Sequence, residues 1–186
     1  MNYLFFDTET TGKIINWKAP ISKVDNFPRI TQLGMMRYSD NRLIASHNFI
    51  IYPDGWTVPV EKFFIENGMS TDRCKEFGVP IRKALDQFLY EIANSDVLIA
   101  HNMAFDMPVV GAEMFRLGLK SSKILPKICT MQSSIKHCNL PRLKYPKLSE
   151  LHFKLFGTEP EVLHDALQDV KTTAKCFFEL KKLGII

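Results

Sequence analysis

The first twelve residues constrain this chain most, because they join an apolar run directly to a pair of carboxylates. Residues 3–6 are Tyr, Leu, Phe and Phe, and the acids Asp7 and Glu9 follow with one residue between them. Such a run is typical of a strand buried on both faces. Side chains alternate along a strand, so both acids should project from one face at its end. Because neighbouring acids repel each other, and Mg²⁺ or Mn²⁺ commonly compensates them, the stretch predicts half of a metal site.

The length and composition of the chain indicate one globular domain. The chain has 186 residues, of which 46% are hydrophobic and 24% are charged. These values are ordinary for a single folded unit, so we expect one domain over residues 1–186. The formal net charge of +4 is compatible with a nucleic-acid partner without requiring one.

Cysteines and apolar segments both favour a cytoplasmic protein. The four cysteines have no zinc-site or CxxC spacing, so we expect reduced thiols rather than disulfides. The N-terminal apolar run ends at Asp7, which is too early for a signal peptide. No run of about 18 apolar residues occurs, so we expect no membrane span.

Strand and helix patterns alternate after the first strand. Residues 13–28 are polar and irregular and should form a long loop, and residues 53–72 should be loop-like because Pro59 and Gly68 interrupt them. Further strands are expected at residues 30–38, 43–52, 96–100 and 127–130. Helices are expected at residues 80–93, 103–117, 132–137, 148–156 and 165–183. This order predicts an α/β fold, with a mixed sheet of about five strands flanked by helices.

The helix after the fourth strand carries a third acid. Asn102 is expected to cap this helix, and Pro108 is tolerated only near a helix start, so the regular part should begin close to Asp106. Asp106 would then lie just beyond the carboxyl end of a strand. Open α/β sheets place their ligands at that edge.

A fourth acid, Asp169, lies on the apolar face of the final helix, between Ala166 and Thr173. A lone acid on an inner helix face is more often paired with Lys or Arg than bound to a metal. Four acids that each stand in an apolar context weaken that alternative. Asp7, Glu9, Asp106 and Asp169 are therefore expected to share one site.

Three segments place these acids in recurring sequence contexts: FDTETTG at Phe6–Gly12, HNMAFD at His101–Asp106 and HDALQD at His164–Asp169. They resemble the motifs of the DEDDh 3′→5′ exonucleases, the DnaQ-like group of the ribonuclease H-like superfamily. This group includes the proofreading subunit of bacterial DNA polymerase III, ribonuclease T and oligoribonuclease. They stand in the family's order with fitting separations, so the resemblance spans essentially the whole chain and implies a ribonuclease H-like fold.

Two positions depart from the family pattern. Asn67 stands where members often carry a histidine, and Cys129 precedes Thr130 where an Asp-Thr pair is frequent. The histidine is not a metal ligand in the family. The first departure therefore bears on substrate contacts rather than on activity.

The resemblance implies hydrolysis of phosphodiester bonds with two divalent ions, Mg²⁺ or Mn²⁺. It implies that Asp7 bridges the ions, that Glu9 and Asp169 complete the site with the nucleophilic water, and that Asp106 holds the second ion. His164 is the expected general base, because a histidine on the loop before the last helix can reach the water and titrates near neutral pH.

Substrate contacts are expected around the first two motifs. A role for His101 in shaping the loop around Asp106 is favoured over a catalytic one, and Phe105 could pack on a base or, as we favour, fill the core. The residues expected to bind substrate are Thr8, Thr10, Thr11, Gly12, His101, Asn102 and Phe105.

Two loops could add further substrate contacts. Single strands are held by basic grooves and base stacking. The loop at residues 139–147 carries Arg142, Lys144, Tyr145 and Lys147, and the loop at residues 13–28 carries Lys13, Trp17 and Lys18. In both cases the alternative is a solvated loop without a binding role.

Three functions remain open from the sequence. The favoured one is a metal-dependent 3′→5′ exonuclease that acts on single-stranded DNA ends and releases nucleoside 5′-monophosphates, with a possible proofreading or repair role beside a DNA polymerase. The alternative within the class is a 3′→5′ exoribonuclease that resembles ribonuclease T or oligoribonuclease. A non-catalytic nucleic-acid binding module is disfavoured, because the four acids and His164 are all present.

Overall fold

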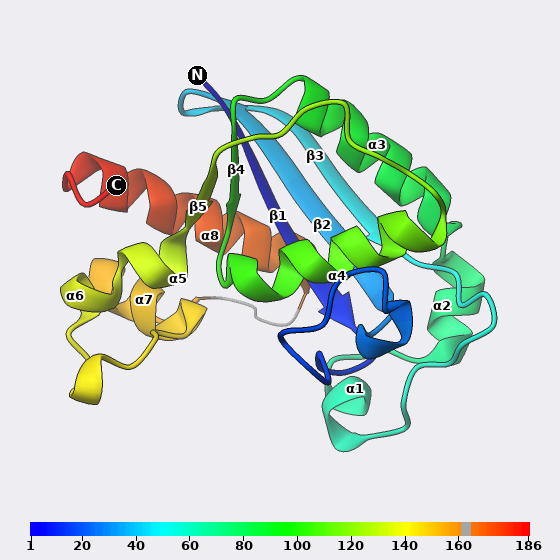
Figure 1. The fold of residues 1–186 in the computed structure, drawn as a ribbon. Helices are drawn as coiled ribbons and strands as arrows, with labels where there is room; N and C mark the ends of the chain where they lie inside the picture. Colours follow the sequence, from blue (N-terminus) through cyan, green and yellow to red (C-terminus); the bar gives the residue numbers. More distant parts are fainter. Residues whose placement is uncertain (161–164) are drawn as a thin grey trace.

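A computed structural model describes residues 1–160 and 165–186 and contains one five-stranded sheet (Figure 1). Its strand order is β3-β2-β1-β4-β5; β1 pairs antiparallel with β2 and parallel with β4. The strands are β1 (Asn2–Thr10), β2 (Ile30–Ser39), β3 (Arg42–Ile50), β4 (Val97–Ala100) and β5 (Lys127–Cys129). The expected mixed α/β sheet is therefore confirmed, with the apolar N-terminal run as its central strand.

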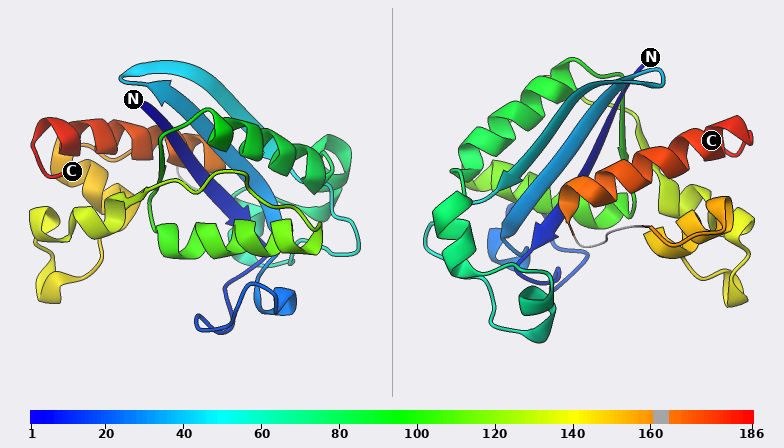
Figure 2. Two further views of the ribbon diagram at one scale, coloured as in Figure 1. Left: turned by 45° about the horizontal axis from the view of Figure 1, so that its top comes forward. Right: turned by 180° about the vertical axis from the view of Figure 1, so that it is seen from behind.

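Helices cover both faces of this sheet. In Figures 1 and 2, α3 and α4 lie on one face and α8 crosses the other, while α5, α6 and α7 gather beyond β5. The helices are α1 (Lys62–Glu66), α2 (Thr71–Phe77), α3 (Ile81–Ala93), α4 (Met103–Arg116), α5 (Thr130–Ser133), α6 (Ile135–Cys138), α7 (Leu148–Phe156) and α8 (Ala166–Lys182), with 3-10 turns η1 (Val24–Asn26) and η2 (Pro141–Leu143). Among the helices of the described residues, none is long and apolar enough to cross a membrane.

Strand β1 separates two apolar cores. Leu4 and Phe6 pack into the core beneath α3 and α4, whereas Tyr3 and Phe5 pack against α8. All four are buried because the strand lies in the middle of the sheet. The same alternation directs Asp7 and Glu9 towards the α8 face and Thr8 towards the α4 face.

Gly34 in β2 lets the start of α8 approach the sheet closely. It pairs with Asp7 across the two strands. A Cβ atom at this position would lie 2.5 Å from the backbone carbonyl carbon of Ala166. Any other residue would push α8 outwards, so this glycine sets the distance between the first turn of α8 and the end of β1.

Two expected loop and helix boundaries were wrong. The segment 53–72 is not all loop, because α1 and the start of α2 lie within it. Helix α4 begins at Met103, as expected for residues 103–117, but it is already regular there rather than only from near Asp106, and Pro108 lies inside it. Asn102 does precede the helix, but it has a left-handed backbone, with φ of 70°, and its side chain makes no capping hydrogen bond. The helix thus starts from a tight turn rather than from a side-chain cap.

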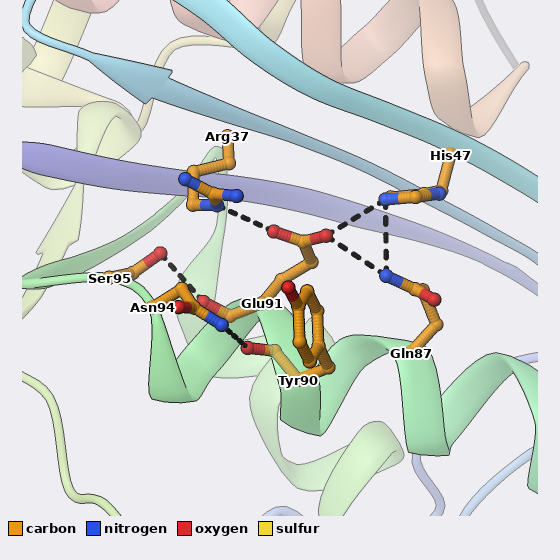
Figure 3. A network of polar contacts seen from close by, with 7 residues as sticks. All are labelled: Arg37, His47, Gln87, Tyr90, Glu91, Asn94 and Ser95. Carbon is orange, nitrogen blue, oxygen red and sulfur yellow. Dashed lines mark hydrogen bonds and ion pairs between the residues drawn. The ribbon is translucent and has the colours of Figure 1, made fainter.

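A buried polar network fastens α3 to the sheet (Figure 3). Glu91 of α3 is 1% exposed and accepts hydrogen bonds from Arg37 of β2 at 2.6 Å and from Gln87 at 2.9 Å. Its other neighbour is His47 of β3, whose Nε2 lies 2.9 Å from the carboxylate. Although burial raises the pKa of Glu91, the hydrogen bonds from Arg37 and His47 outweigh it, and the net pKa is lowered.

Candidate active site

Three carboxylates meet where β1 ends beside the first turn of α8. One oxygen from each of Asp7, Glu9 and Asp169 lies within 4.8 Å of the other two. Asp7 and Glu9 come from alternate positions of β1, and Asp169 comes from the first turn of α8. Strand alternation and the close approach at Gly34 together produce this cluster.

Asp106 lies near this cluster, on the α4 side of β1, but is not one of the three acids whose oxygens approach within 4.8 Å. It lies in the first turn of α4 and is 3% exposed. Its Oδ1 accepts hydrogen bonds from the Thr8 hydroxyl at 2.7 Å and from the Thr8 backbone N–H at 3.1 Å. Thr8 therefore ties the first turn of α4 to the last residues of β1. Its buried hydroxyl donates to Asp106, and the contact of Thr8 with a substrate stays a prediction.

Mutual repulsion and burial make these acids reluctant to ionise. Loss of solvation raises the pKa of Asp7 well above its ordinary range, and Asp106, Asp169 and Glu9 raise it further. Burial, followed by the charges of Asp169 and Asp106, raises the pKa of Glu9 to about 7. Burial also raises the pKa of Asp106 to about 7, although the hydrogen bonds from Thr8 oppose the change. Acids in such surroundings ionise together near neutral pH only when positive charge compensates them.

The cluster fits a divalent cation. In the described part of the chain, no Lys or Arg forms an ion pair with Asp7, Glu9 or Asp106. Carboxylate oxygens are the hard ligands that Mg²⁺ and Mn²⁺ prefer. The carboxylate ligands, and the lack of a Lys or Arg partner at Asp7, Glu9 and Asp106 among the described residues, therefore both agree with a metal site.

Polar contacts hold the N-terminus of α8 in place. Asp165 caps the helix by accepting a hydrogen bond from the Gln168 backbone N–H at 3.1 Å. The Gln32 side chain of β2 donates to Asp165 at 2.8 Å and accepts from the Ala166 backbone N–H at 3.4 Å. Gln32 and Gly34 thus position Asp169, and neither was expected from the sequence. A glycine inside a strand is a sign of close backbone approach that could have indicated Gly34.

The residues after Glu9 form the start of an ordered loop. The Thr10 hydroxyl donates to the Gly12 carbonyl at 2.8 Å. The Thr11 hydroxyl accepts from the Arg29 backbone N–H at 3.0 Å, and the Thr11 N–H donates to the Arg29 carbonyl at 2.9 Å. Gly12 is exposed, and a Cβ there would meet nothing within 4 Å. The contacts of Thr10, Thr11 and Gly12 with a substrate stay predictions.

His101 joins three segments around the site. Its Nε2 lies 3.0 Å from the Pro146 carbonyl, and its Nδ1 lies 3.0 Å from the Thr130 hydroxyl. A carbonyl only accepts, so Nε2 carries the proton and Nδ1 accepts from Thr130. Burial lowers the pKa of His101 to about 4, against the effect of the Pro146 hydrogen bond. The neutral ring therefore fastens the basic loop at residues 139–147 to the end of β4, and Thr130 is its partner.

The basic loop at residues 139–147 has an unusual backbone. Arg142 and Leu143 adopt φ of 59° and 51°, in the left-handed region that side chains other than glycine rarely occupy. Leu143 is 58% exposed and Tyr145 is 55% exposed. Lys144 is engaged by Glu150 in an ion pair at 2.8 Å. The loop therefore presents Arg142, Leu143 and Tyr145 outwards, and its part in substrate binding stays a prediction.

The remaining site predictions fall in different places. His164 lies outside the described residues. Phe105 precedes Asp106 on α4 and is partly buried against the core, while Asn102 occupies the turn before that helix. Asn67, at the position that departs from the family pattern, lines a small cavity together with Glu9.

The sequence matches the family described as Exonuclease (RNase_T) over residues 4–177. DNA polymerase III PolC-type from Caldanaerobacter subterraneus is 24% identical over 190 residues, which cover 98% of this chain and 12% of the relative. The same protein from Clostridium perfringens is 28% identical over 186 residues, covering 97% of this chain and 11% of the relative. The chain thus spans about an eighth or less of the length of these relatives.

Solved structures with the same fold include two nucleases. Exonuclease I of E. coli in complex with a dT13 oligonucleotide superimposes with a TM-score of 0.73 at 17% identity, covering 97% of this chain and 41% of that one. The nuclease domain of 3′hExo, a DEDDh family member bound to rAMP, gives a TM-score of 0.72 at 15% identity, covering 99% and 93%. The ribonuclease H-like fold implied by the three motifs is confirmed. Because the family match spans nearly all of the sequence, this chain belongs to the exonuclease (RNase_T) family.

Proposed function

We propose that this chain is a metal-dependent 3′→5′ exonuclease that removes nucleoside 5′-monophosphates from single-stranded DNA ends. The observation that carries the proposal is the approach of Asp7, Glu9 and Asp169 to within 4.8 Å, with buried Asp106 beside them, in a member of an exonuclease family. A phosphodiester is an anion that resists attack by water. Divalent cations held by these carboxylates would supply the positive charge that this reaction needs.

The four acids would divide the work of holding two ions, Mg²⁺ or Mn²⁺. Asp7 would bridge them, Glu9 and Asp169 would hold the ion on the side of the attacking water, and Asp106 would hold the ion near the leaving group. Two such ions, when bound, stabilise both the attacking and the leaving oxygen. Thr8 would position Asp106 through the hydrogen bonds described above.

His164 is the proposed general base. It precedes the helix cap Asp165 in the sequence, so its imidazole would accept the proton of the attacking water near neutral pH. The neutral His101, which is fastened to Pro146 and Thr130, would instead keep the basic loop beside the site.

DNA is the favoured substrate, and RNA is the second candidate. The curated relatives are DNA polymerases of the PolC type, and exonuclease I was solved with a DNA oligonucleotide. The 3′hExo domain was solved with rAMP, which favours the RNA alternative. The PolC relatives also support association with a DNA polymerase, as a proofreading activity, and we include this partner in the proposal.

The test is digestion of matched DNA and RNA oligonucleotides that are labelled in the 3′-terminal nucleotide. Incubation with Mg²⁺ or Mn²⁺ should release labelled mononucleotide from single-stranded DNA, and faster than from RNA. EDTA and the Asp7→Ala variant should abolish release. Faster release from RNA would show that RNA rather than DNA is the preferred substrate. Release that persists in Asp7→Ala protein would refute the metal site.

A further inference from the structure

The loop between β1 and β2 is built to be rigid. The Asn16 N–H donates to the Asn26 side chain at 2.8 Å, and the Asn26 amide donates back to the Asn16 carbonyl at 2.9 Å. Arg116 of α4 donates to the carbonyls of Val24 and Phe27. Such pairing fixes the loop against α4, beside the end of β1 (Figure 1).

This rigid loop holds a tryptophan in solvent. Trp17 is 61% exposed, although it lies one residue beyond Asn16 and its hydrogen-bonded pair. Its ring centroid lies 6.2 Å from that of Phe105, at an interplanar angle of 51°. Phe105 directly precedes the metal-site acid Asp106 on α4. Trp17 therefore contacts the residue that precedes Asp106, and Phe105 itself packs partly against the core.

The chemistry around Trp17 matches a single strand better than a protein surface. Lys13 and Lys18 are exposed on the same loop, and cations that alternate with exposed aromatic rings hold single-stranded nucleic acid. Every base has a flat face that stacks on an indole ring. A ring held in place by its loop loses little freedom when a base stacks on it.

We propose that Trp17 and Phe105 form a nucleobase subsite, where a base of the single-stranded substrate stacks on the exposed face of Trp17. The inference rests on the proposed function, since it needs a nucleic-acid strand whose 3′ end lies in the acid cluster. It adds a binding residue from a loop outside the three motifs. Stacking reads no hydrogen-bond pattern, so this subsite accepts any base.

The chain provides its own reporter for this subsite. Its only tryptophans are Trp17 and Trp56, and Trp56 is half-buried and lies beneath the Arg29 guanidinium. A Trp56→Phe protein therefore reports on Trp17 alone. Titration with a hydrolysis-resistant phosphorothioate DNA strand in Mg²⁺ should quench its fluorescence. An unchanged spectrum at saturating strand concentration would overturn the proposal.

Affinity measurements supply the second readout. Trp17→Ala should weaken binding of the same strand by roughly 5- to 150-fold, the usual worth of one base stack, and Trp17→Phe should restore most of it. Tyr90→Ala is the matched control, because Tyr90 is 59% exposed on α3 and should leave binding unchanged. Replacing one nucleotide at a time by an abasic residue should remove the Trp17→Ala effect at a single position.

Failure of this inference differs from failure of the proposed function. Mononucleotide release by the wild-type protein without quenching, and with full affinity in Trp17→Ala, would refute the subsite alone. Quenching without mononucleotide release would keep the subsite and refute the exonuclease. If abasic replacement at every position left the effect of Trp17→Ala on strand affinity unchanged, no base would stack on Trp17. That result would also refute the subsite.

Discussion

Helix α4 carries two buried acids in contrasting surroundings. Asp106 in the first turn is 3% exposed, and Glu113 near the other end is 1% exposed. Glu113 is met by cations, since Arg29 donates to it at 2.8 Å and Arg116 lies 3.1 Å away. Asp106 receives hydrogen bonds from Thr8 and faces other acids. Burial of an acid is therefore no evidence of a site until its neighbours are known.

Glu91 on α3 repeats the pattern of Glu113. Burial raises the pKa of Glu91, but hydrogen bonds from Arg37 and His47 lower it overall, whereas burial and the neighbouring acids all raise the pKa of Asp7. The paired acids join elements of the fold: Glu91 joins α3 to the sheet, and Glu113 joins α4 to the loop before β2. At the end of β1, by contrast, no Lys or Arg of the described residues forms an ion pair with Asp7, Glu9 or Asp106. Buried acids in such surroundings fit a metal site.

The largest expected effect follows from removing an acid of the cluster. Asp7→Asn should lower the rate of mononucleotide release by at least roughly 10³-fold, because metal ions supply several kcal/mol of transition-state stabilisation. Its metal-free protein should unfold at the same or a higher temperature at pH 8, since a repelling charge is gone. Asp40→Asn is the control, because Asp40 pairs with the N-terminus at an exposed turn. An Asp7→Asn protein that releases mononucleotide at the wild-type rate would contradict the contrast drawn between clustered and paired acids.

The next effect concerns an acid that is paired. Glu91→Ala should lower the free energy of unfolding by about 3 kcal/mol, because it leaves Arg37 and His47 without their partner. The expected loss is at the low end for breaking a buried ion pair, because the side chains of Arg37 and His47 are 15% and 26% exposed.

Urea titration measures this loss, and nuclease activity per folded molecule should stay unchanged. Asp86→Ala removes an exposed pair with Arg82 and should change stability by less than about 0.5 kcal/mol. Equal losses in the two variants would contradict the role given to Glu91.

A smaller effect is expected from the partner of Asp106. Thr8→Val removes the hydroxyl that donates at 2.7 Å and keeps the shape of the side chain. The rate should fall roughly 10- to 100-fold, as for other residues that orient metal ligands. Thr8→Ser should stay near the wild-type rate. A full rate in Thr8→Val would show that the backbone N–H alone positions Asp106.

The smallest effect is a dependence of stability on pH. In EDTA, Glu9 and Asp106 have pKa values of about 7 in the folded protein, against ordinary values of 4.5 and 3.8. The folded state then binds more protons than the unfolded state, so stability is lost as pH rises from about 4 through 7. The unfolding temperature should fall by at least roughly 2–4 °C between pH 5 and pH 8, the shift that about 1 kcal/mol produces.

Saturating Mn²⁺ should remove this slope, because it binds the ionised acids. Glu91 contributes in the opposite sense, since its lowered pKa gives stability that is lost only as pH falls below its ordinary value of 4.5. An unfolding temperature in EDTA that does not change with pH would show that repulsion between these acids does not destabilise the folded protein.

Most of the fold could be predicted from the sequence because its signals are local. The apolar run at residues 3–6, the cap Asp165 and the stop at Gly184 lie next to the elements that they define. Boundaries failed where local signals were misleading: Pro108 is tolerated inside α4, and short helices lie in the segment 53–72. Three motifs in family order identified the exonuclease family before any geometry was known.

The sequence by itself determined that Asp7 and Glu9 share a face, because strand periodicity fixes it. Only the tertiary structure decided which buried acids meet cations. Glu91 and Arg37 are 54 positions apart, and Glu113 and Arg29 are 84 apart, so no local pattern joins them. The approach of Asp169 depends on the missing side chain of Gly34. Charge compensation acts through space between distant segments, and therefore it is settled by packing rather than by periodicity.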